Sequence, residues 1–489
     1  MNVVRKPRIA IIGMGPAGLF AALLLSRFDL FVDVYEKGTD INGRRCPYAV
    51  SGVCSRCNHC GISEGLGDGG GGADGKALES EGGNAVKKLG KIRYHKYLSW
   101  ASMIYASYAE LAGIKPIKYG RKITEYLENC KKRAKKHGLT MEIHPIDHYG
   151  TDGARRLYYQ IEQDLKSKPN VNLYFETEVD NIDFSTRSVY SEKLGEVQYD
   201  DIIIAPGRSG SDWFAKICEK NNIRSKFGKL IVGVRAEVPD YIDGERKGPL
   251  VEVERDCLEG KLRKKFPDGF FVKSAKTFCQ CEGGEVTTEY YRGKGVAVNG
   301  HSNSETKTRF SNVSLLLDID SEQVENPKEF IWDLLKLANK EGKGQPITQT
   351  YSAFKERRAN TTEELKELKS TKKKLFAGDL TKVFSPAMVS ALTAFIEAIE
   401  KVFPGFTKEL VLHGIEIKPV SFTPEMDDSF RVAPHIYVAG DGVNLTHGLL
   451  PASGIGLAVA AKLLKHLAEI YLSISITYKV LKKDHTFLP

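Results

Sequence analysis

The stretch Arg8–Lys37 constrains the fold of this chain more than any other part of the sequence. It begins with a short apolar run, Ile9–Ile12, and continues with glycines spaced as G-x-G-x-x-G at Gly13, Gly15 and Gly18. In such a pattern the first glycine permits a tight turn, the second lets backbone approach a pyrophosphate, and the third allows a helix to pack closely on a strand. The stretch therefore predicts a βαβ unit that binds a dinucleotide.

The residues after the glycines support this prediction. Leu19–Leu25 reads as an apolar helix, and Phe31–Tyr35 as a second strand that ends at Glu36. The helix N-terminus would present free N–H groups to phosphates, and Glu36, 18 residues past Gly18, would accept hydrogen bonds from ribose hydroxyls. A signal peptide or membrane anchor is the alternative, but three glycines and a proline interrupt the run, which is too short to span a bilayer.

Composition sets the broad class of the protein. The 489 residues are 42% hydrophobic and 27% charged, as expected for a globular chain of several domains. The net charge of +9 suits a phosphate-rich cofactor or an acidic substrate but does not call for nucleic acid. We expect no transmembrane segment, because no later stretch approaches about 20 uninterrupted apolar residues. Nine cysteines, an odd number, and the lack of a secretory leader predict reduced thiols and a cytoplasmic location.

Four of these cysteines are packed into fifteen residues, at Cys46, Cys54, Cys57 and Cys60. Thiolates two residues apart can converge on one ion or cluster, so a [4Fe–4S] cluster or a zinc ion is the specific hypothesis. Free thiols that merely brace the loop are the alternative. The neighbouring His59 is interpreted as a bystander rather than as a ligand.

The segment after Glu36 indicates which dinucleotide is bound. The pattern Glu-x6-Gly-Arg, which ends at Arg44, resembles the signature of glutathione-reductase-type FAD proteins and favours FAD over NAD. Gly61–Lys76 then holds eight glycines in sixteen residues, which excludes a packed element and suits close backbone approach to a ligand. We interpret this loop as facing the flavin, with a flexible linker as the alternative.

The middle of the chain alternates between helical and β-rich stretches. Residues 85–140 read as a helical cap, followed by an amphipathic helix at Gly153–Lys166 and strands at Val171–Val179 and Tyr199–Gly207. From Leu230 to about Asp320 the sequence predicts strands and polar turns, a candidate substrate domain. Because no second strand–GxGxxG–helix unit is found there, a dedicated NAD(P)H domain is not expected, although NAD(P)H as electron donor stays open. Further helices are expected at residues 327–340, 362–374 and 386–402.

Two features bear on catalysis. Cys279 and Cys281 would point to the same face of a strand, which leaves a redox pair or substrate contact open, although two buried strand cysteines explain them as well. His435–Lys465 predicts a strand, a loop and a long helix. Asp441 would accept from the ribityl hydroxyls, and a helix N-terminus near Pro451–Ser453 would face the flavin N1/O2 edge. His447, in the loop between them, is the candidate acid or base.

Taken together, the motifs resemble a family of bacterial and archaeal proteins known as uncharacterised FAD-dependent dehydrogenases, within the glutathione-reductase-type FAD superfamily. The motifs are GMGPAGLFAA, GRRC with C..C..C.I, HYGTDGARR, IIIAPG, VGVRAEVP, FCQCEGGEV, GDL, VFPGF and YVAGDG, and they cover nearly the whole chain. One departure is Gly72-Ala73, where relatives typically have Phe-Ser before Asp-Gly-Lys. Its implication is a differently shaped pocket beside the flavin.

The resemblance implies an α/β fold: a discontinuous Rossmann-like FAD-binding domain with an inserted β-rich substrate domain and a helical cap. The expected segments are 1–60 (FAD domain), 61–140 (glycine-rich flavin loop and cap), 141–232 (FAD domain), 233–345 (substrate domain), 346–410 (helical) and 411–489 (FAD domain). With the motifs above, it gives this set of FAD contacts: Gly13, Gly15, Pro16, Ala17, Gly18, Glu36, Lys37, Arg44, Lys76, Val179, Ala205, Gly207, Gly440, Asp441 and Ser453.

The implied function is an FAD-dependent oxidoreductase, a dehydrogenase or reductase that transfers a hydride between flavin and an organic small molecule. A flavin monooxygenase is the nearest variant. An electron carrier with FAD plus an iron–sulfur cluster, serving a redox protein partner, is a different class that bound iron would favour. An RNA-binding flavoprotein is disfavoured by the mild charge and the lack of an aromatic–basic patch, and lipid substrates stay open.

Overall fold

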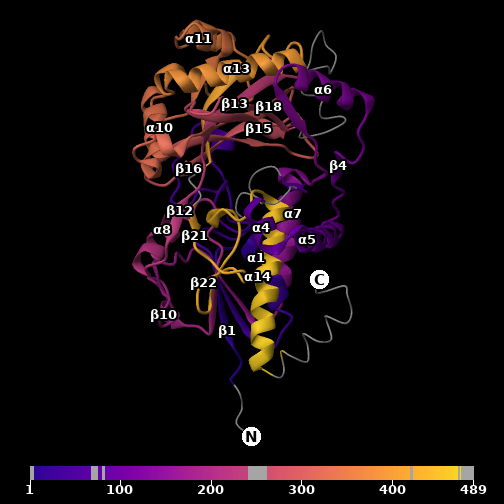
Figure 1. Ribbon diagram of the computed structural model, residues 1–489, viewed down its shortest axis with the longest axis vertical. Coiled ribbons are helices and arrows are strands. Elements are labelled where there is room, and N and C mark those ends of the chain that lie inside the picture. The colour runs from indigo at the N-terminus through magenta and orange to yellow at the C-terminus, as the bar shows by residue number, and fades with distance from the viewer. Residues whose placement is uncertain are drawn as a thin grey trace.

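The computed structural model describes residues 5–67, 75–79, 83–240, 261–418, 422–471 and 474. The molecule is elongated, with two lobes stacked along its long axis (Figure 1). The lower lobe holds a mainly parallel sheet, in which only the edge strand β22 is antiparallel to its neighbour among the described strands, and the upper lobe holds an antiparallel sheet. The chain passes between the lobes more than once, so each lobe combines segments that are distant in the sequence.

The lower lobe is built on a six-stranded sheet in the order β22-β23-β11-β1-β2-β7. Strand β1 pairs in parallel with β2 on one side and β11 on the other, so the carboxyl ends of these strands share one edge. Their bounds are β1 Arg8–Ile12, β2 Phe31–Tyr35, β7 Val171–Tyr174, β11 Asp201–Ile204, β22 Arg431–Ala433 and β23 Ile436–Val438.

Helices cover this sheet because their apolar faces need burial. Helix α1 packs on α14, α14 on α5, and α5 on α7, and these helices lie together beside the parallel sheet (Figure 1). The helices of this lobe are α1 Pro16–Leu25, α2 Tyr48–Ser51, α4 Gly83–Leu89, α5 Lys91–Leu111, α7 Gly150–Lys166, α8 Ser211–Lys220, and α14 Leu449–Ile470, with a 3-10 turn, η3, at Asp441–Val443.

The upper lobe is organised around a seven-stranded sheet in the order β19-β20-β13-β18-β15-β14-β5. Its strand pairs are antiparallel, and within the described ranges the parallel pairs are those of the lower sheet and one isolated bridge between Thr348 and Ala377. The strands are β5 Leu139–Glu142, β13 Leu230–Pro239, β14 Lys261–Lys265, β15 Val272–Cys281, β18 Phe310–Ile319, β19 Ile347–Thr350 and β20 Val411–Lys418.

One face of this sheet is apolar and packs against helices: Figure 1 shows α13 above β13, β15 and β18, with α10 at one side of the sheet. Alternate residues of β13, such as Val232, Val234 and Ala236, enter this core. The other face looks toward the lower lobe (Figure 1). The helices of the upper lobe are α6 Glu125–Lys136, α10 Pro327–Glu341, α11 Tyr351–Lys355, α12 Thr362–Glu367 and α13 Pro386–Val402, with 3-10 turns at Ser321–Gln323 and Leu380–Lys382.

Four small sheets complete the chain, two of them beside the junction of the lobes. A three-stranded sheet β3-β6-β4 follows the glycine-rich segment, and the hairpin β16-β17 lies beneath the large antiparallel sheet. The strands are β3 Lys76–Leu78, β4 Ile117–Tyr119, β6 Ile146–His148, β8 Asn181–Asp183, β9 Ser188–Ser191, β10 Gly195–Gln198, β12 Ser225–Phe227, β16 Glu285–Tyr291, β17 Gly295–His301 and β21 Phe422–Pro424.

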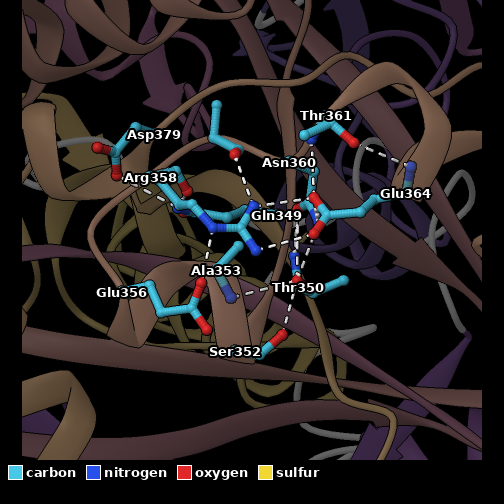
Figure 2. Close-up of polar contacts among 11 residues, drawn as sticks. Gln349, Thr350, Ser352, Ala353, Glu356, Arg358, Asn360, Thr361, Glu364 and Asp379 are labelled. Atoms are coloured by element: carbon cyan, nitrogen blue, oxygen red, sulfur yellow. Dashed lines mark hydrogen bonds and ion pairs between the residues drawn. The ribbon is translucent and has the colours of Figure 1, made fainter.

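A polar network fixes the turn between α11 and α12 (Figure 2). Arg358 donates to both carboxylate oxygens of Glu364 at 2.8 and 2.9 Å, and to Glu356 at 2.6 Å. Thr361 and Glu364 cap the first turn of α12 reciprocally. The Arg358 guanidinium lowers the pKa of Glu364 to about 2. The polar residues of this exposed turn therefore order it locally.

The α/β class and the parallel βαβ unit at the N-terminal end of the described chain are confirmed, whereas some local expectations are wrong. Strand β20, expected in the C-terminal FAD segment, lies in the antiparallel sheet. Residues 85–140 contain β4 and β5 besides three helices, and helix α12 ends at Glu367, well short of 374. These strands pair with partners far away in the sequence, which local periodicity does not reveal. No helix within the described ranges is both long and apolar enough to cross a membrane.

Candidate active site

The glycine turn after β1 is closed by contacts that leave no room for a side chain. Gly13 has φ +102°, and a Cβ there would lie 2.2 Å from the carbonyl oxygen of Ala205. A Cβ on Gly18 would lie 1.9 Å from the carbonyl oxygen of Gly13. Gly15 immediately precedes α1, and no side chain caps that helix. The first N–H groups of α1 are therefore free of side-chain acceptors, as an anion-binding helix N-terminus requires.

Glu36 links three parts of the site. Its buried carboxylate accepts hydrogen bonds from the backbone N–H of Met14 at 2.9 Å, of Gly38 at 2.8 Å and of Gly65 at 3.1 Å. These contacts hold the carboxylate at the carboxyl end of β2, beside the turn after β1. Glu36 lies at the carboxyl edge of the parallel sheet, where open α/β sheets bind their ligands. Its hydrogen bond to a ribose stays a prediction.

Lys37 and Arg44, which the resemblance assigns to cofactor contact, hold the following loop in the structure. The buried Arg44 guanidinium donates to the carbonyl oxygens of Gly61, Ile62 and Leu66 at 2.7–3.2 Å. Lys37 pairs with Glu64, with 2.8 Å between Nζ and Oε1. Both side chains thus order the loop that approaches Glu36. Their contact with a cofactor stays a prediction.

The glycine-rich segment ends against both lobes. Gly75 has φ +61°, and a Cβ there would lie 2.3 Å from the carbonyl oxygen of Gly150. The Lys76 ammonium is buried and donates to the carbonyl oxygen of Gln280 in β15. This bond joins the end of the segment to the large antiparallel sheet. Gly72-Ala73, the departure noted above, lies outside the described residues.

The C-terminal segment returns to the same edge of the parallel sheet. Gly440 has φ +86°, and a Cβ there would lie 3.1 Å from the Ala17 Cβ, while a Cβ on Gly442 would lie 2.1 Å from the carbonyl oxygen of Gly207. The Asp441 carboxylate accepts from Thr446 Oγ1 at 2.7 Å and from the Gly448 N–H at 3.0 Å. Gly440 and Gly442, on either side of Asp441, thereby approach the first turn of α1 and the turn after β11.

Two expected contacts in this part of the site differ in detail. Helix α14 begins at Leu449, two residues before the expected start, and Ser453 lies one turn inside it. The buried Ser453 hydroxyl donates to the Leu449 carbonyl oxygen and lies 2.8 Å from the Tyr105 hydroxyl of α5. Ser453 therefore joins α14 to α5. The first turn of α14, which follows Gly448 and has no side-chain cap, lies where the sequence predicted that Ser453 would face the flavin. Val179 is buried in the core of the lower lobe, beyond the end of β7.

His447 lies in the loop between Asp441 and α14, and its side chain is exposed to solvent. Surrounding protein nevertheless lowers the pKa of this imidazole. The nearby Asp441 carboxylate opposes that shift, whereas Lys276, Arg208 and Lys229 reinforce it. His447 is therefore neutral near pH 7 and able to accept a proton.

The four clustered cysteines lie close enough to affect one another's ionisation. Burial raises the pKa of Cys46 to about 11, and the thiols of Cys60, Cys54 and Cys57 act in the same direction. Cys60 Sγ accepts from the Tyr290 N–H at 3.3 Å. In the described part of the chain no group of three or more His, Cys, Asp or Glu side chains is arranged to hold a metal ion. Metal binding by these four thiols stays a prediction.

Cys279 and Cys281 do not share a strand face in the expected way. A bulge between Phe278 and Gln280 interrupts the pairing of β15 with β18, and Cys279 within it has φ +43°. Cys281 is fully buried, with its sulfur 3.8 Å from Nη1 of Arg235. The simple alternation of side chains fails at a bulge because one strand gains an unpaired residue. The structure gives no support to a redox pair here, and their catalytic role stays a prediction.

Comparison with known proteins adds the family. Residues 7–227 match the pyridine nucleotide-disulphide oxidoreductase family, and residues 259–419 match the C-terminal domain-like family of FAD-dependent proteins. The chain is thus similar to FAD-dependent oxidoreductases in two separate regions, each shorter than half of its length. The first region covers the lower lobe up to β12 together with α6 and β5 of the upper lobe, and the second covers most of the remaining upper sheet. FAD is the cofactor of the chain.

Individual relatives are distant. An uncharacterised protein of Clostridium beijerinckii (strain ATCC 51743 / NCIMB 8052) is 21% identical over 476 residues, which cover 94% of this chain and 81% of the relative. Among solved structures, CtdE in complex with FAD has a TM-score of 0.37 at 11% identity, covering 99% of this chain and 91% of its own. Tetracycline destructase Tet(51) has a TM-score of 0.39 at 9% identity, covering 99% and 88%. Likeness at this level carries no inference about the reaction.

The residues of this flavoprotein fit FAD. Two helix N-termini, those of α1 and α14, lack side-chain caps and lie at one edge of the sheet, where backbone N–H groups can receive phosphate and flavin oxygens. The buried carboxylate of Glu36 and the half-buried carboxylate of Asp441 lie where the sequence predicts contacts with ribose and ribityl hydroxyls, and these contacts stay predictions. The crowded turns at Gly13 and Gly442 keep backbone, rather than side chains, facing that edge.

Proposed function

We propose that this flavoprotein is a dehydrogenase or reductase that transfers a hydride between FAD and an organic small molecule. The observation that carries the proposal is the meeting of three distant segments at one edge of the parallel sheet. The turn after β1 contacts Ala205 after β11, and Gly442 contacts Gly207. Such an edge is where open α/β sheets bind their ligands. FAD supplies the electron chemistry there, and the protein orients it.

We propose His447 as the group that exchanges a proton with the substrate. It lies between Asp441, expected at the ribityl chain, and the N-terminus of α14, expected at the flavin ring. The lowered pKa keeps the imidazole neutral at pH 7, as a general base requires. Asp441 is engaged by Thr446 and the Gly448 N–H, which fix the loop that carries His447.

The electron donor and the cellular location are also proposals. Within the described residues the parallel sheet of the lower lobe accounts for one dinucleotide-binding unit, so NAD(P)H, if it is the donor, would react without a domain of its own. The proposed cytoplasmic location rests on cysteine usage. The cysteines in the described ranges are all free thiols.

The first experiment is an absorption spectrum of anaerobically purified protein together with iron and zinc analysis. We expect flavin bands near one equivalent, which bleach when a reductant is added and return with an organic acceptor. A protein without flavin, even after reconstitution with FAD, would refute the proposal. Near-stoichiometric iron with a broad visible shoulder would replace it with an electron carrier in which the clustered cysteines hold a metal. Oxygen incorporation into product would replace it with a monooxygenase.

A further inference from the structure

The polar face of the seven-stranded sheet carries a group of cations opposite the proposed flavin site. This lysine cluster consists of Lys229, Lys261, Lys276 and Lys418. Three of its ammonium groups surround one aromatic ring: Nζ of Lys261, Lys276 and Lys418 lie 5.3, 5.8 and 5.3 Å from the centroid of the Phe278 ring. These residues come from three strands, β14, β15 and β20, so the sheet itself brings them together.

Two carboxylates near this cluster are already paired with cations other than Lys276. Asp318 pairs with Lys229 at 3.0 Å. Glu416 pairs with Lys418 at 2.9 Å, but it already forms a buried ion pair with Arg235. Lys276 has no carboxylate partner in the described part of the chain, although it is half-buried. An ammonium group that is partly desolvated and unpaired gains most from an added anion.

Positive charges outnumber negative ones among the groups that affect the pKa of Lys276. Burial lowers the pKa of this lysine to about 8, and the neighbouring charges of Lys229, Arg263 and Lys261 lower it while Asp318 raises it. The ring of Phe278, two residues along β15, is itself only half-buried. The Lys276 ammonium group and the partly exposed Phe278 ring thus lie side by side, where one ligand could contact both.

One electrostatic influence and one hydrogen bond connect the strand that carries Lys276 to the proposed flavin site. Lys276 and Lys229 are close enough to His447 to affect its ionisation. Farther along the same strand, the Gln280 carbonyl oxygen accepts from Lys76 at the end of the glycine-rich segment. Strand β15 therefore faces the edge of the lower lobe where FAD is expected, from the opposite lobe (Figure 1).

We propose that the substrate of this enzyme is an organic anion whose charged group binds Lys276 and whose apolar part packs on Phe278. The inference rests on the proposed function, since it assigns the ligand of that same site. Binding from this side places the charged end of the substrate on the upper lobe and its reacting carbon toward His447. Lys276 is a positioning residue in this scheme, because it holds the substrate without exchanging a proton or hydride with it.

The test uses the FAD-loaded full-length protein, with benzoate as probe and the neutral benzamide as its control. Binding is followed by the flavin difference spectrum and by calorimetry, and FAD content and reduction are measured on the same preparation. We expect saturable benzoate binding and at least tenfold weaker binding of benzamide. Lys276→Met should weaken benzoate binding at least tenfold, and Lys276→Arg should retain it because the charge is kept.

The matched control is Lys273→Met, on the same strand. Lys273 is exposed and paired with Asp320 at 2.8 Å, and its loss should change benzoate binding less than twofold. Equal binding of benzoate and benzamide, or unchanged affinity in Lys276→Met, would overturn the inference while a normal flavin leaves the proposed function standing. If Lys276→Met changes FAD content or flavin potential but not benzoate affinity, the cations serve the cofactor and the inference fails. A protein that holds no FAD would remove both proposals.

Discussion

Arg235 of β13 and Glu416 of β20 form a two-armed ion pair in which neither side chain reaches solvent. Nε donates to one carboxylate oxygen at 2.9 Å and Nη2 to the other at 3.0 Å. Glu416 also accepts from Ser314 and Lys418, and Arg235 donates to Asn312. Burial alone would raise the pKa of Glu416, but Arg235 lowers it to about 2. The pair therefore stays ionised inside the upper lobe.

Breaking this pair should be costly because it leaves a buried charge. We expect Glu416→Gln to lower the free energy of unfolding by about 3–5 kcal/mol. Replacing both partners with methionine should recover most of that loss, since no uncompensated charge remains. Urea unfolding of the two variants measures the difference. A single variant as stable as the wild type would show that the pair is not ionised.

Gly15→Val should yield a folded protein that has lost FAD. Gly15 has φ −71°, an ordinary value for any residue, so valine imposes no backbone strain. Its side chain would occupy the place where the pyrophosphate approaches α1. We expect FAD content below about a tenth of the wild-type value, measured by absorbance, with unchanged circular dichroism. The FAD content of Gly15→Ala should lie between those of the wild type and Gly15→Val. Full FAD occupancy in Gly15→Val would refute the assignment of this site.

Gly456→Ala should loosen the contact between α14 and α1. A Cβ on Gly456 would lie 2.1 Å from the carbonyl oxygen of Ala17, which is backbone and cannot swing aside. Overpacking of this kind costs about 1–3 kcal/mol, and thermal unfolding should show it. The matched control is Gly454→Ala in the same helix, where the nearest atoms lie at 3.3 Å and a small effect is expected. If Gly456→Ala lowered the thermal stability no more than Gly454→Ala, the close approach of Gly456 to Ala17 would not limit the packing of α14 on α1.

Acidification should destabilise the protein through His413. The buried imidazole ring has Nε2 3.0 Å from Oε2 of Glu237 and Nδ1 3.2 Å from Oγ1 of Thr348. Burial lowers the pKa of His413 below the ordinary 6.5, although the Glu237 carboxylate opposes this shift. Below pH 6.5 the unfolded chain therefore binds a proton that the folded chain does not. The free energy of unfolding should fall as pH falls from 6.5, by up to about 1.4 kcal/mol per pH unit. In His413→Asn, urea unfolding between pH 5 and 7 should show a shallower dependence.

His447→Asn should abolish the acidic limb of the pH–rate profile. Because the pKa of His447 is lowered from its ordinary value, kcat/KM should be constant near pH 7 and decline only at a lower pH than it would for an ordinary imidazole. Loss of a general base should reduce kcat by about 100- to 10,000-fold, with FAD content unchanged. Steady-state kinetics with the organic substrate measures both. An unaltered profile would assign the proton transfer to another group.

Local signals predicted part of this fold well. The expected strand Phe31–Tyr35 and the helix over residues 386–402 have the bounds observed, because each is specified by its own residues. Ser385 caps the latter helix through the Met388 N–H, and Pro386 follows as its first residue. The glycine turn at Gly13 was equally predictable, since only glycine fits its crowded, left-handed backbone.

What the sequence did not predict depends on partners far along the chain. The bulge at Cys279 arises from pairing with β18, and the burial of Ser453 arises from Tyr105 on another helix. Arg44 was assigned to a cofactor because a motif names it, but its bonds to loop carbonyls need the loop to be folded. The convergence of lysines on Phe278 depends on the order and register of the five neighbouring strands from β20 to β14, which no local pattern contains.

The route of the chain between the lobes has a practical consequence. Strand β5 belongs to the upper sheet, the next strand β6 to the small sheet beside the glycine-rich segment, and the chain rises again at β13 before returning after β20. No single cut releases either lobe with all of its strands. A gene fragment encoding one lobe would therefore produce a sheet with missing members, and exchange of a whole lobe between relatives would require several simultaneous junctions. Evolution can vary the surfaces of such a protein far more easily than it can recombine its halves.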